Sequence, residues 1–296
     1  MNETPSSSIL CLYHDDADGR ACAAIIRQKL GTDVFLKPMN YGQPTPWALI
    51  EQADRVIIAD FSLPLDEMKS ISSEHHLVWI DHHQSALQDL GPVADQWDGI
   101  QDTSEAACVL TWKYYYPEKD LPRAVILIGD RDIWRWEEQD TGPFNEGLHH
   151  RDTDPHRDEL WTPLLNDDSS LVEKIIREGA LLFQARLKEI KRAVNAYGYE
   201  VAFEGHRTLA INRRGTGDLG ARIRELGYEL AYCYLDTWEQ GQLVTKVTLY
   251  SEKLDVSQLA KRYGGGGHPG ASGFQFPRRE IPFPARADIK FNPGKK

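Results

Sequence analysis

The sequence predicts an α/β protein with two domains and a long helix that joins them. Three observations predict this architecture. Short apolar runs alternate with amphipathic segments in the first half of the chain, which is typical of a parallel sheet covered by helices. A continuous helical pattern follows over residues 169–196. Hairpin patterns then replace it, so we predict domains at 1–170 and 198–296, with a connecting helix at 171–197.

The elements of the first domain follow from apolar periodicity and from residues that begin or end helices. Apolar runs predict strands at 8–14, 33–38, 55–61 and 76–83. Helical spacing predicts helices at 19–31, 46–53, 104–116 and 121–134. Gly31 ends the first of these helices, Pro46 begins the second, and Thr103 is placed to cap the third. The polar stretch 137–168 predicts a loop-rich insertion.

The second domain shows an α+β pattern of a usual domain size. Hairpins are predicted at 198–212 and 228–251, with turns at 204–206 and 240–241. Helices are predicted at 218–227 and 255–264. The last helix runs directly into four consecutive glycines, which one helix-ending residue does not explain.

Composition and charge limit the classes of partner. The chain has 296 residues and a net charge of −11, whereas proteins that track long nucleic acids are usually basic. We therefore expect recognition of a short anion rather than a long nucleic-acid groove. No apolar run is long enough for a membrane span, and no signal peptide is evident. Four cysteines without a C-x-x-C pair indicate reduced thiols and a cytoplasmic location.

Acidic side chains and histidines follow four of the predicted apolar elements. They are His14, Asp15, Asp16 and Asp18; Asp60; Asp81, His82 and His83; and Asp130 with Asp132. Each group alone is explained by a turn or a helix cap. In an open parallel sheet, however, the carboxyl ends of the strands share one edge, where ligands bind. Carboxylates crowded there would repel one another, and divalent cations remove the conflict.

The types of donor indicate which metals fit. Magnesium prefers oxygen ligands alone, and closed zinc sites favour cysteine and histidine. A mixture of imidazole and carboxylate suits Mn²⁺, with Mg²⁺, Zn²⁺, Fe²⁺ and Co²⁺ as alternatives. The number of donors indicates two ions that share a carboxylate, an arrangement that serves phosphoryl transfer.

Five stretches resemble the motifs of a known family. "HDDADGRACA", "IIADFS", "IDHHQS" and "LIGDRD" resemble the four motifs of the DHH phosphoesterase superfamily. "DVSQLAKRYGGGGHPGASGF" resembles the glycine-rich signature of its C-terminal DHH-associated domain. The resemblance covers nearly the whole chain and implies an active site in the cleft between the two domains. Members include RecJ single-strand exonucleases, nanoRNases, cyclic-dinucleotide phosphodiesterases and, more distantly, family II pyrophosphatases.

The resemblance implies a ligand role for six side chains. One ion would be held by His14 and Asp18, the other by Asp16, His82 and Asp130, and Asp60 would bridge them. The bridging position would carry the attacking water.

The resemblance also implies roles for two side chains that are not metal ligands. Asp81 would orient His82, because a metal-bound imidazole needs an acceptor for its second nitrogen. His83 would contact the scissile phosphate or donate a proton.

Two departures from the family pattern concern the metal ligands. Arg20 stands where some members have a second aspartate in the pattern D-G-D, so Asp16 must supply that ligand. In the fourth motif we choose Asp130 by its match to "IGD", and Asp132 competes with it.

The glycine-rich stretch is the predicted substrate-binding element. Consecutive glycines let backbone N–H groups approach an anion closely, and the histidine behind them can hydrogen-bond to a nucleotide or stack on it. The expected substrate-binding residues are Gly265, Gly266, Gly267, His268 and Ser251. Many members carry an arginine before the serine, where this chain has Tyr250, which could stack on a base.

These observations predict a two-metal phosphodiesterase that hydrolyses short oligoribonucleotides or linear dinucleotides to nucleoside monophosphates. A cyclic dinucleotide, another small phosphoester or single-stranded DNA is an alternative substrate. The alternative outside enzymes is a catalytically silent nucleotide-binding regulator. We expect no membrane partner, and a homodimer is possible.

Overall fold

The structure, a computed structural model, describes residues 8–239, 241–278, 290 and 291. The chain forms two compact units, Met1–Phe183 (unit 1) and Gln184–Lys296 (unit 2). The boundary lies inside helix α9, Ser169–Tyr197, so this helix belongs to both units. Within the described part of the chain, no helix combines the length and the apolar content that a membrane span requires.

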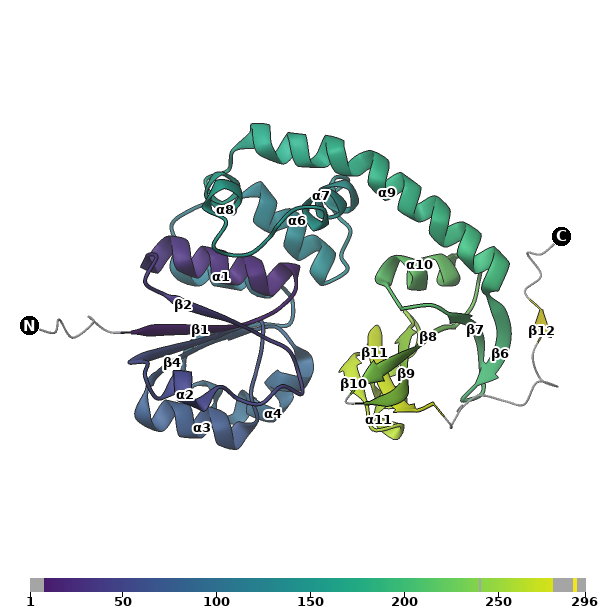
Figure 1. Cartoon of the computed structure of the whole chain (residues 1–296), viewed down its shortest axis with the longest axis horizontal. Helices are drawn as coiled ribbons and strands as arrows, with labels where there is room; N and C mark the ends of the chain where they lie inside the picture. Colours follow the sequence, from purple (N-terminus) through teal and green to yellow (C-terminus); the bar gives the residue numbers. More distant parts are fainter. Residues whose placement is uncertain (1–7, 240, 279–289, 292–296) are drawn as a thin grey trace, which may run out of the picture. The chain divides into compact units, whose positions relative to one another are not determined.

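Unit 1 is built on a five-stranded sheet in the order β2-β1-β3-β4-β5 (Figure 1). The strands are β1 Ile9–His14, β2 Phe35–Met39, β3 Arg55–Ala59, β4 His76–Asp81 and β5 Asp98–Gln101. Every neighbouring pair is parallel, which confirms the predicted sheet. All carboxyl ends therefore lie along one edge, and the strand order reverses between β1 and β3.

Helices cover both faces of this sheet (Figure 1). They are α1 Ala17–Leu30, α2 Trp47–Ile50, α3 Leu65–Glu74, α4 Gln84–Ala94, α5 Ala107–Tyr115, α6 Arg123–Asp132, α7 Thr141–His149 and α8 Asp158–Leu165. Alternate strand residues point to opposite faces: Cys11 and Tyr13 pack with α1 and α5, whereas Leu10 and Leu12 pack with α3 and α4. Two apolar cores result, one on each face.

The predicted loop-rich insertion at 137–168 is wrong, because α7 and α8 lie within it. Pro143 falls in the first turn of α7, where a missing N–H costs nothing. Each helix buries apolar side chains against the first core, including Phe144 in α7 and Trp161 in α8. Packing of these side chains outweighs the polar composition of the stretch.

Unit 2 is built on a seven-stranded sheet in the order β10-β11-β9-β8-β7-β6-β12. The strands are β6 Tyr199–Phe203, β7 His206–Asn212, β8 Leu230–Glu239, β9 Gln242–Tyr250, β10 Gly266–His268, β11 Ala271–Pro277 and β12 Lys290–Phe291. The strands of both predicted hairpins pair, and β7 pairs with β8 in parallel, while Gln240 of the second predicted turn lies outside the described residues. Helices α10 Gly217–Glu225 and α11 Val256–Arg262 contribute to separate apolar cores.

Candidate metal centre

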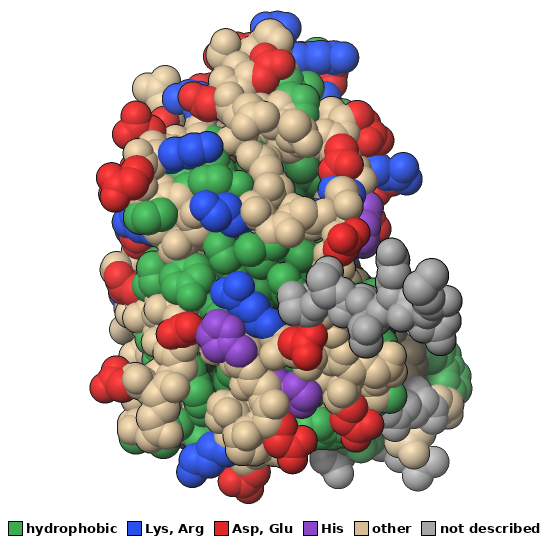
Figure 2. Space-filling view, turned by 90° about the vertical axis from the view of Figure 1, so that its left-hand side faces the viewer, with side chains coloured by type: hydrophobic (Ala, Val, Ile, Leu, Met, Phe, Trp, Pro, Cys, Tyr) green, Lys and Arg blue, Asp and Glu red, His purple; other side chains and the backbone are tan. Residues whose placement is uncertain are grey.

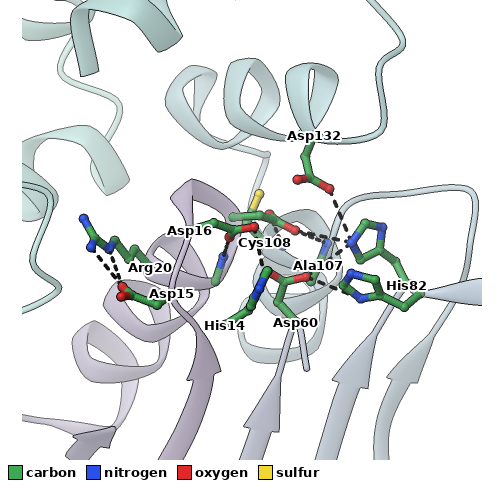
Figure 3. A network of polar contacts seen from close by, with 12 residues as sticks. His14, Asp15, Asp16, Arg20, Asp60, His82, Ala107, Cys108 and Asp132 are labelled. Atoms are coloured by element: carbon green, nitrogen blue, oxygen red, sulfur yellow. Dashed lines mark hydrogen bonds and ion pairs between the residues drawn. The ribbon is translucent and has the colours of Figure 1, made fainter. Parts of the chain in front are cut away.

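The centre lies at the carboxyl edge of the unit 1 sheet, where the strand order reverses. Ligands of open α/β sheets bind at such a point. His14 ends β1, Asp60 directly follows β3, and Asp81 ends β4. Figure 3 shows His14, Asp60 and His82 close together, with Asp132 reaching toward His82 from the end of α6.

Asp60 occupies the middle of the centre. It is 1% exposed and has a φ of 55°, a left-handed conformation that aspartate tolerates better than most residues. Neither carboxylate oxygen has a hydrogen-bond partner among the described residues. Its nearest partners are the imidazole nitrogens of His82 at 3.2 Å and His14 at 3.6 Å, which leave a buried carboxylate poorly satisfied, so the position favours a further positive group. A cation between Asp60 and its neighbours would satisfy both oxygens.

One group of donors lies beside Asp60 Oδ2. His14 Nδ1 is 3.6 Å from this oxygen and 2.9 Å from Asp16 Oδ2. Asp16 also caps α1, because its Oδ1 accepts a hydrogen bond from Gly19 N at 3.0 Å. Donor atoms of His14, Asp16 and Asp60 all lie within 4.8 Å of one another, as they must to share one ion.

A second group of donors surrounds His82. Its Nε2 is 3.2 Å from Asp60 Oδ1, 3.3 Å from Asp132 Oδ2 and 3.8 Å from Asp18 Oδ2 (Figure 3). Donor atoms of Asp18, His82 and Asp132 again lie within 4.8 Å of one another. The two oxygens of Asp60 therefore face different groups, which is the geometry of a bridging carboxylate.

This grouping corrects the division of ligands that the resemblance implied. Asp16 lies with His14, and Asp18 lies with His82, whereas the opposite pairing was expected. The cause is that Asp18 is turned toward helix α5. Its Oδ2 accepts a hydrogen bond from Ala107 N at 2.8 Å, and its Oδ1 accepts one from Cys108 N at 2.9 Å.

The same contact corrects the expected start of α5. The sequence placed Thr103 as the cap, but Ala106 is the residue that precedes the helix, and it makes no side-chain cap. Asp18 supplies the acceptor for two amides of the first turn instead. The helix N-terminus also favours a negative charge, so α5 fixes Asp18 both geometrically and electrostatically.

Asp132, and not the predicted Asp130, is the residue of the fourth motif whose side chain faces the centre. The Asp130 carboxylate accepts hydrogen bonds from Glu137 N at 2.9 Å and Glu138 N at 3.3 Å, and from the Thr141 hydroxyl. It thereby holds the segment that connects α6 to α7. Asp132, two residues further along, carries the carboxylate that lies beside His82.

Asp81 holds His83 rather than the ring of His82. Its Oδ1 accepts a hydrogen bond from the Nδ1–H of His83 at 2.7 Å, and others from the backbone N–H groups of His82 and His83. The expectation that Asp81 orients the His82 ring is therefore corrected. Burial opposes a proton on His83, but Asp81 outweighs it and raises the pKa of this imidazole.

Crowding of like charges shifts several pKa values in the centre. Burial, with the charges of Asp18 and Asp16, raises the pKa of Asp60 well above its usual range. Burial and the charge of Asp18 have the same effect on the pKa of Asp132. Burial lowers the pKa of His14, but Asp16 and Asp60 together raise it to about 10. Four carboxylates meet here, so divalent cations are the natural counter-charge.

An aromatic side chain that the sequence analysis did not single out also lies at the centre. Tyr41 follows β2, and its ring centroid is 4.8 Å from that of Phe61, 5.8 Å from His14 and 6.0 Å from His83. The signal was available, because β2 is parallel to β1 and its carboxyl end must lie at the same edge. Tyr41 was missed because no charged side chain directly follows β2 to mark this position.

The glycine-rich stretch of unit 2 forms part of a hairpin. Gly266–His268 is strand β10, antiparallel to β11 at the edge of the sheet. A Cβ on Gly265 would lie 2.1 Å from the carbonyl oxygen of Gly273, and Gly267 has a φ of 137°. The hairpin itself requires these two glycines. A Cβ on Gly266 would meet no described atom within 4 Å, so the hairpin does not require this one.

Two expected substrate contacts of unit 2 have structural roles instead. Ser251 is 2% exposed, and its hydroxyl donates to Glu229 O at 2.7 Å while accepting from Lys253 N. Tyr250 is buried, with its ring against Gly220, where a Cβ would lie 2.5 Å from it. Neither side chain is presented to a ligand. His268 is half-buried in β10.

No protein-family model matches the chain. The chain is 25% identical over 231 residues to an uncharacterized protein of Acanthamoeba polyphaga mimivirus. The match covers 75% of this chain and 53% of that protein, so the chain spans about half the length of this relative. It is 22% identical over 284 residues to oligoribonuclease NrnB of Bacillus subtilis (strain 168), covering 88% of this chain and 71% of that protein.

A solved structure reports on the fold. The DHH domain of a protein described as a member of a family of ribosomal proteins superposes with a TM-score of 0.61 at 13% identity. The match covers 96% of this chain and 83% of that one. Fold, the order of the motifs and the NrnB likeness agree. The chain has the fold of a DHH domain.

Proposed function

We propose that the chain is a metal-dependent phosphodiesterase that hydrolyses short oligoribonucleotides or linear dinucleotides to nucleoside monophosphates. The observation that supports this most is the environment of Asp60. Its buried carboxylate has no hydrogen-bond partner among the described residues, and each oxygen faces a separate group of histidine and aspartate donors. Such an arrangement suits two cations that share one carboxylate.

The ligand sets follow from the two donor groups. One ion would be held by His14, Asp16 and Asp60, and the second by Asp18, Asp60, His82 and Asp132. Mixed imidazole and carboxylate donors favour Mn²⁺. When bound, the two ions supply Lewis acidity toward a phosphoryl oxygen and lower the pKa of water at neutral pH.

His83 and Asp81 supply the proton chemistry. Asp81 accepts the Nδ1–H of His83, which fixes the ring and leaves its Nε2 as the atom that transfers a proton. The raised pKa of His83 favours the protonated imidazole. In this proposal His83 protonates the leaving oxygen or hydrogen-bonds to the scissile phosphate.

Charge and likeness support a short substrate. The net charge of −11 opposes non-specific binding of a long polyanion. On the face shown in Figure 2, acidic and basic side chains of the described residues are interspersed, without a continuous basic stripe. The NrnB likeness points the same way, because that relative is named an oligoribonuclease.

The glycine-rich hairpin of unit 2 is a second proposed substrate-binding element. We assign Gly265, Gly266, Gly267 and His268 to the terminal phosphate or base of the substrate. Gly266 supports this assignment, because the hairpin does not need a glycine there, whereas an approaching anion would. Ser251 is left out of the assignment, since its hydroxyl stabilises a turn.

Product analysis on defined substrates tests the proposal. The full chain is incubated with RNAs of two to twenty-four nucleotides, linear and cyclic dinucleotides and single-stranded DNA, with Mn²⁺ or with EDTA. We expect nucleoside monophosphates from the shortest RNAs, and no turnover in EDTA. Asp60→Asn and His82→Ala should abolish turnover. Asp98→Asn and His76→Ala are matched controls, because these residues form an exposed Asp–His pair at 2.7 Å on the surface.

The outcomes separate the alternatives. Preferential cleavage of a cyclic dinucleotide or of DNA would replace the substrate class and keep the metal centre. Activity that persists in Asp60→Asn would refute the metal centre. Nucleotide binding without turnover of any substrate would favour the silent regulator.

A further inference from the structure

Tyr41 is an exposed aromatic residue beside His14 and His83 of the metal centre. It lies in the segment between β2 and α2, at the carboxyl edge of the sheet. Tyr41 as a residue is 55% exposed, although Phe61 beside it is 3% exposed and the His83 side chain is largely buried. The ring therefore presents one surface to the centre and another to solvent.

Burial in the protein core does not account for this placement. An exposed residue of this kind contributes only part of the stabilisation that a fully buried aromatic side chain provides. Single exposed aromatics are common on protein surfaces and need no explanation alone. Tyr41 differs because it contacts side chains of the centre, at ring distances of 5.8 Å from His14 and 6.0 Å from His83.

The distances suit a nucleotide whose phosphate lies at the centre. In a nucleotide only the ribose separates the base from the phosphate. A phosphate beside His14 and His83 would thus bring an adjacent base within reach of a ring that lies about 6 Å from both imidazoles. An exposed aromatic face is the usual platform for an unpaired base, and every base has a π-face to offer it.

We propose that Tyr41 is a substrate-contacting residue that stacks on the nucleobase next to the scissile phosphodiester. The inference rests on the proposed function and adds a substrate class to it: phosphodiesters that carry an unpaired base on the nucleotide bound at the centre. Stacking is tolerant of base identity, so Tyr41 selects for the presence of a base rather than for its sequence.

Four linear dinucleotides test the proposal: one with both bases, two in which one nucleoside is abasic, and one with both nucleosides abasic. Two quantities are measured in Mn²⁺: kcat/KM, and the dissociation constant of the corresponding non-hydrolysable phosphonate analogue by calorimetry. Tyr41→Ala should weaken both about ten-fold for substrates with the stacked base, within the range known for base–aromatic stacking. It should leave both nearly unchanged when that base is missing. Tyr41→Phe keeps the ring and should resemble the wild type.

Phe35→Ala is the matched control. Phe35 is equally exposed at 55%, but it lies at the amino end of β2, away from the carboxyl edge. Its replacement should change neither quantity for any of the four dinucleotides.

The inference and the proposed function fail in different ways. If the wild type cleaves none of the dinucleotides, the proposed function has failed, and the dissociation constants still decide the role of Tyr41. Equal losses with and without bases in Tyr41→Ala would overturn stacking, as would unchanged values. A loss in Tyr41→Phe as large as in Tyr41→Ala would assign the effect to the hydroxyl group and also overturn it.

Discussion

Exchanging the two aspartates of α6 for asparagine, one at a time, separates a structural carboxylate from one of the metal centre. Asp130 is 6% exposed and accepts hydrogen bonds from two backbone amides and from the Thr141 hydroxyl. Asparagine keeps one carbonyl oxygen as an acceptor, but its NH₂ group would face an amide or hydroxyl donor that now bonds to Asp130. Hydrogen bonds to charged groups contribute about 1.5–3 kcal/mol each, so Asp130→Asn should lower the free energy of unfolding by roughly 3 kcal/mol.

Asp132→Asn should have the opposite pattern. The Asp132 side chain is about a quarter exposed and lies among like charges, and burial and Asp18 raise its pKa. Removing its charge should leave the metal-free protein as stable as the wild type, or slightly more stable. The same change removes a proposed ligand, so Mn²⁺ affinity and turnover should fall by at least about 10-fold to 100-fold, the loss that disturbing even an outer-shell partner of a metal causes.

Urea unfolding in EDTA and calorimetric titration with Mn²⁺ measure the two effects. Intrinsic fluorescence reports on unit 1, because Trp238 is the only tryptophan that lies outside it. A loss of stability in Asp132→Asn equal to that in Asp130→Asn would refute the reasoning. So would loss of Mn²⁺ binding in folded Asp130→Asn with normal binding in Asp132→Asn.

Three further predictions concern pH, metal loading and the glycine hairpin. In EDTA the free energy of unfolding should fall as pH rises from about 6.5 to 10, because folded His14, with a pKa of about 10, keeps a proton that the unfolded chain releases. The raised pKa of Asp60 also makes the free energy of unfolding fall as pH rises. Urea unfolding that shows a free energy rising over this interval would contradict the effects of His14 and Asp60. Mn²⁺ binding should release protons, measured by calorimetry in buffers of different ionisation enthalpy; binding without release would mean that the ligands were already deprotonated. Gly265→Ala should destabilise the β10–β11 hairpin by roughly 1–3 kcal/mol, because the added methyl group overpacks it, whereas Gly266→Ala should not. Hydrogen exchange of the hairpin amides measures the difference, and equal exchange in the two variants would refute it.

The parallel sheet was predictable because β1, β3 and β4 are continuous apolar runs. Strand β5 was not, because Asp98–Gln101 is short and polar. It forms through pairing with β4, and Gly99 allows it: with a φ of 133°, a Cβ there would lie 1.8 Å from Trp79 O. Contacts with a neighbouring strand, rather than local pattern, create this element.

The members of the metal centre were predictable from their positions after strands, but their grouping was not. Asp130 and Asp132 are two residues apart on α6, so about 200° of rotation separates their side chains and one of them must face away. Which one does so depends on the segment after α6, which folds back and donates its amides to Asp130. Such tertiary contacts leave no trace in local sequence patterns.

The two hydrogen bonds between Asp18 and the start of α5 have a consequence for metal exchange. They hold the carboxylate whether or not a cation is present, since the amides of Ala107 and Cys108 belong to the backbone of a core helix. Chelators should therefore strip the ions without unfolding unit 1. Re-added metal should then restore the loaded state at a rate set by diffusion and ligand deprotonation, with no refolding phase.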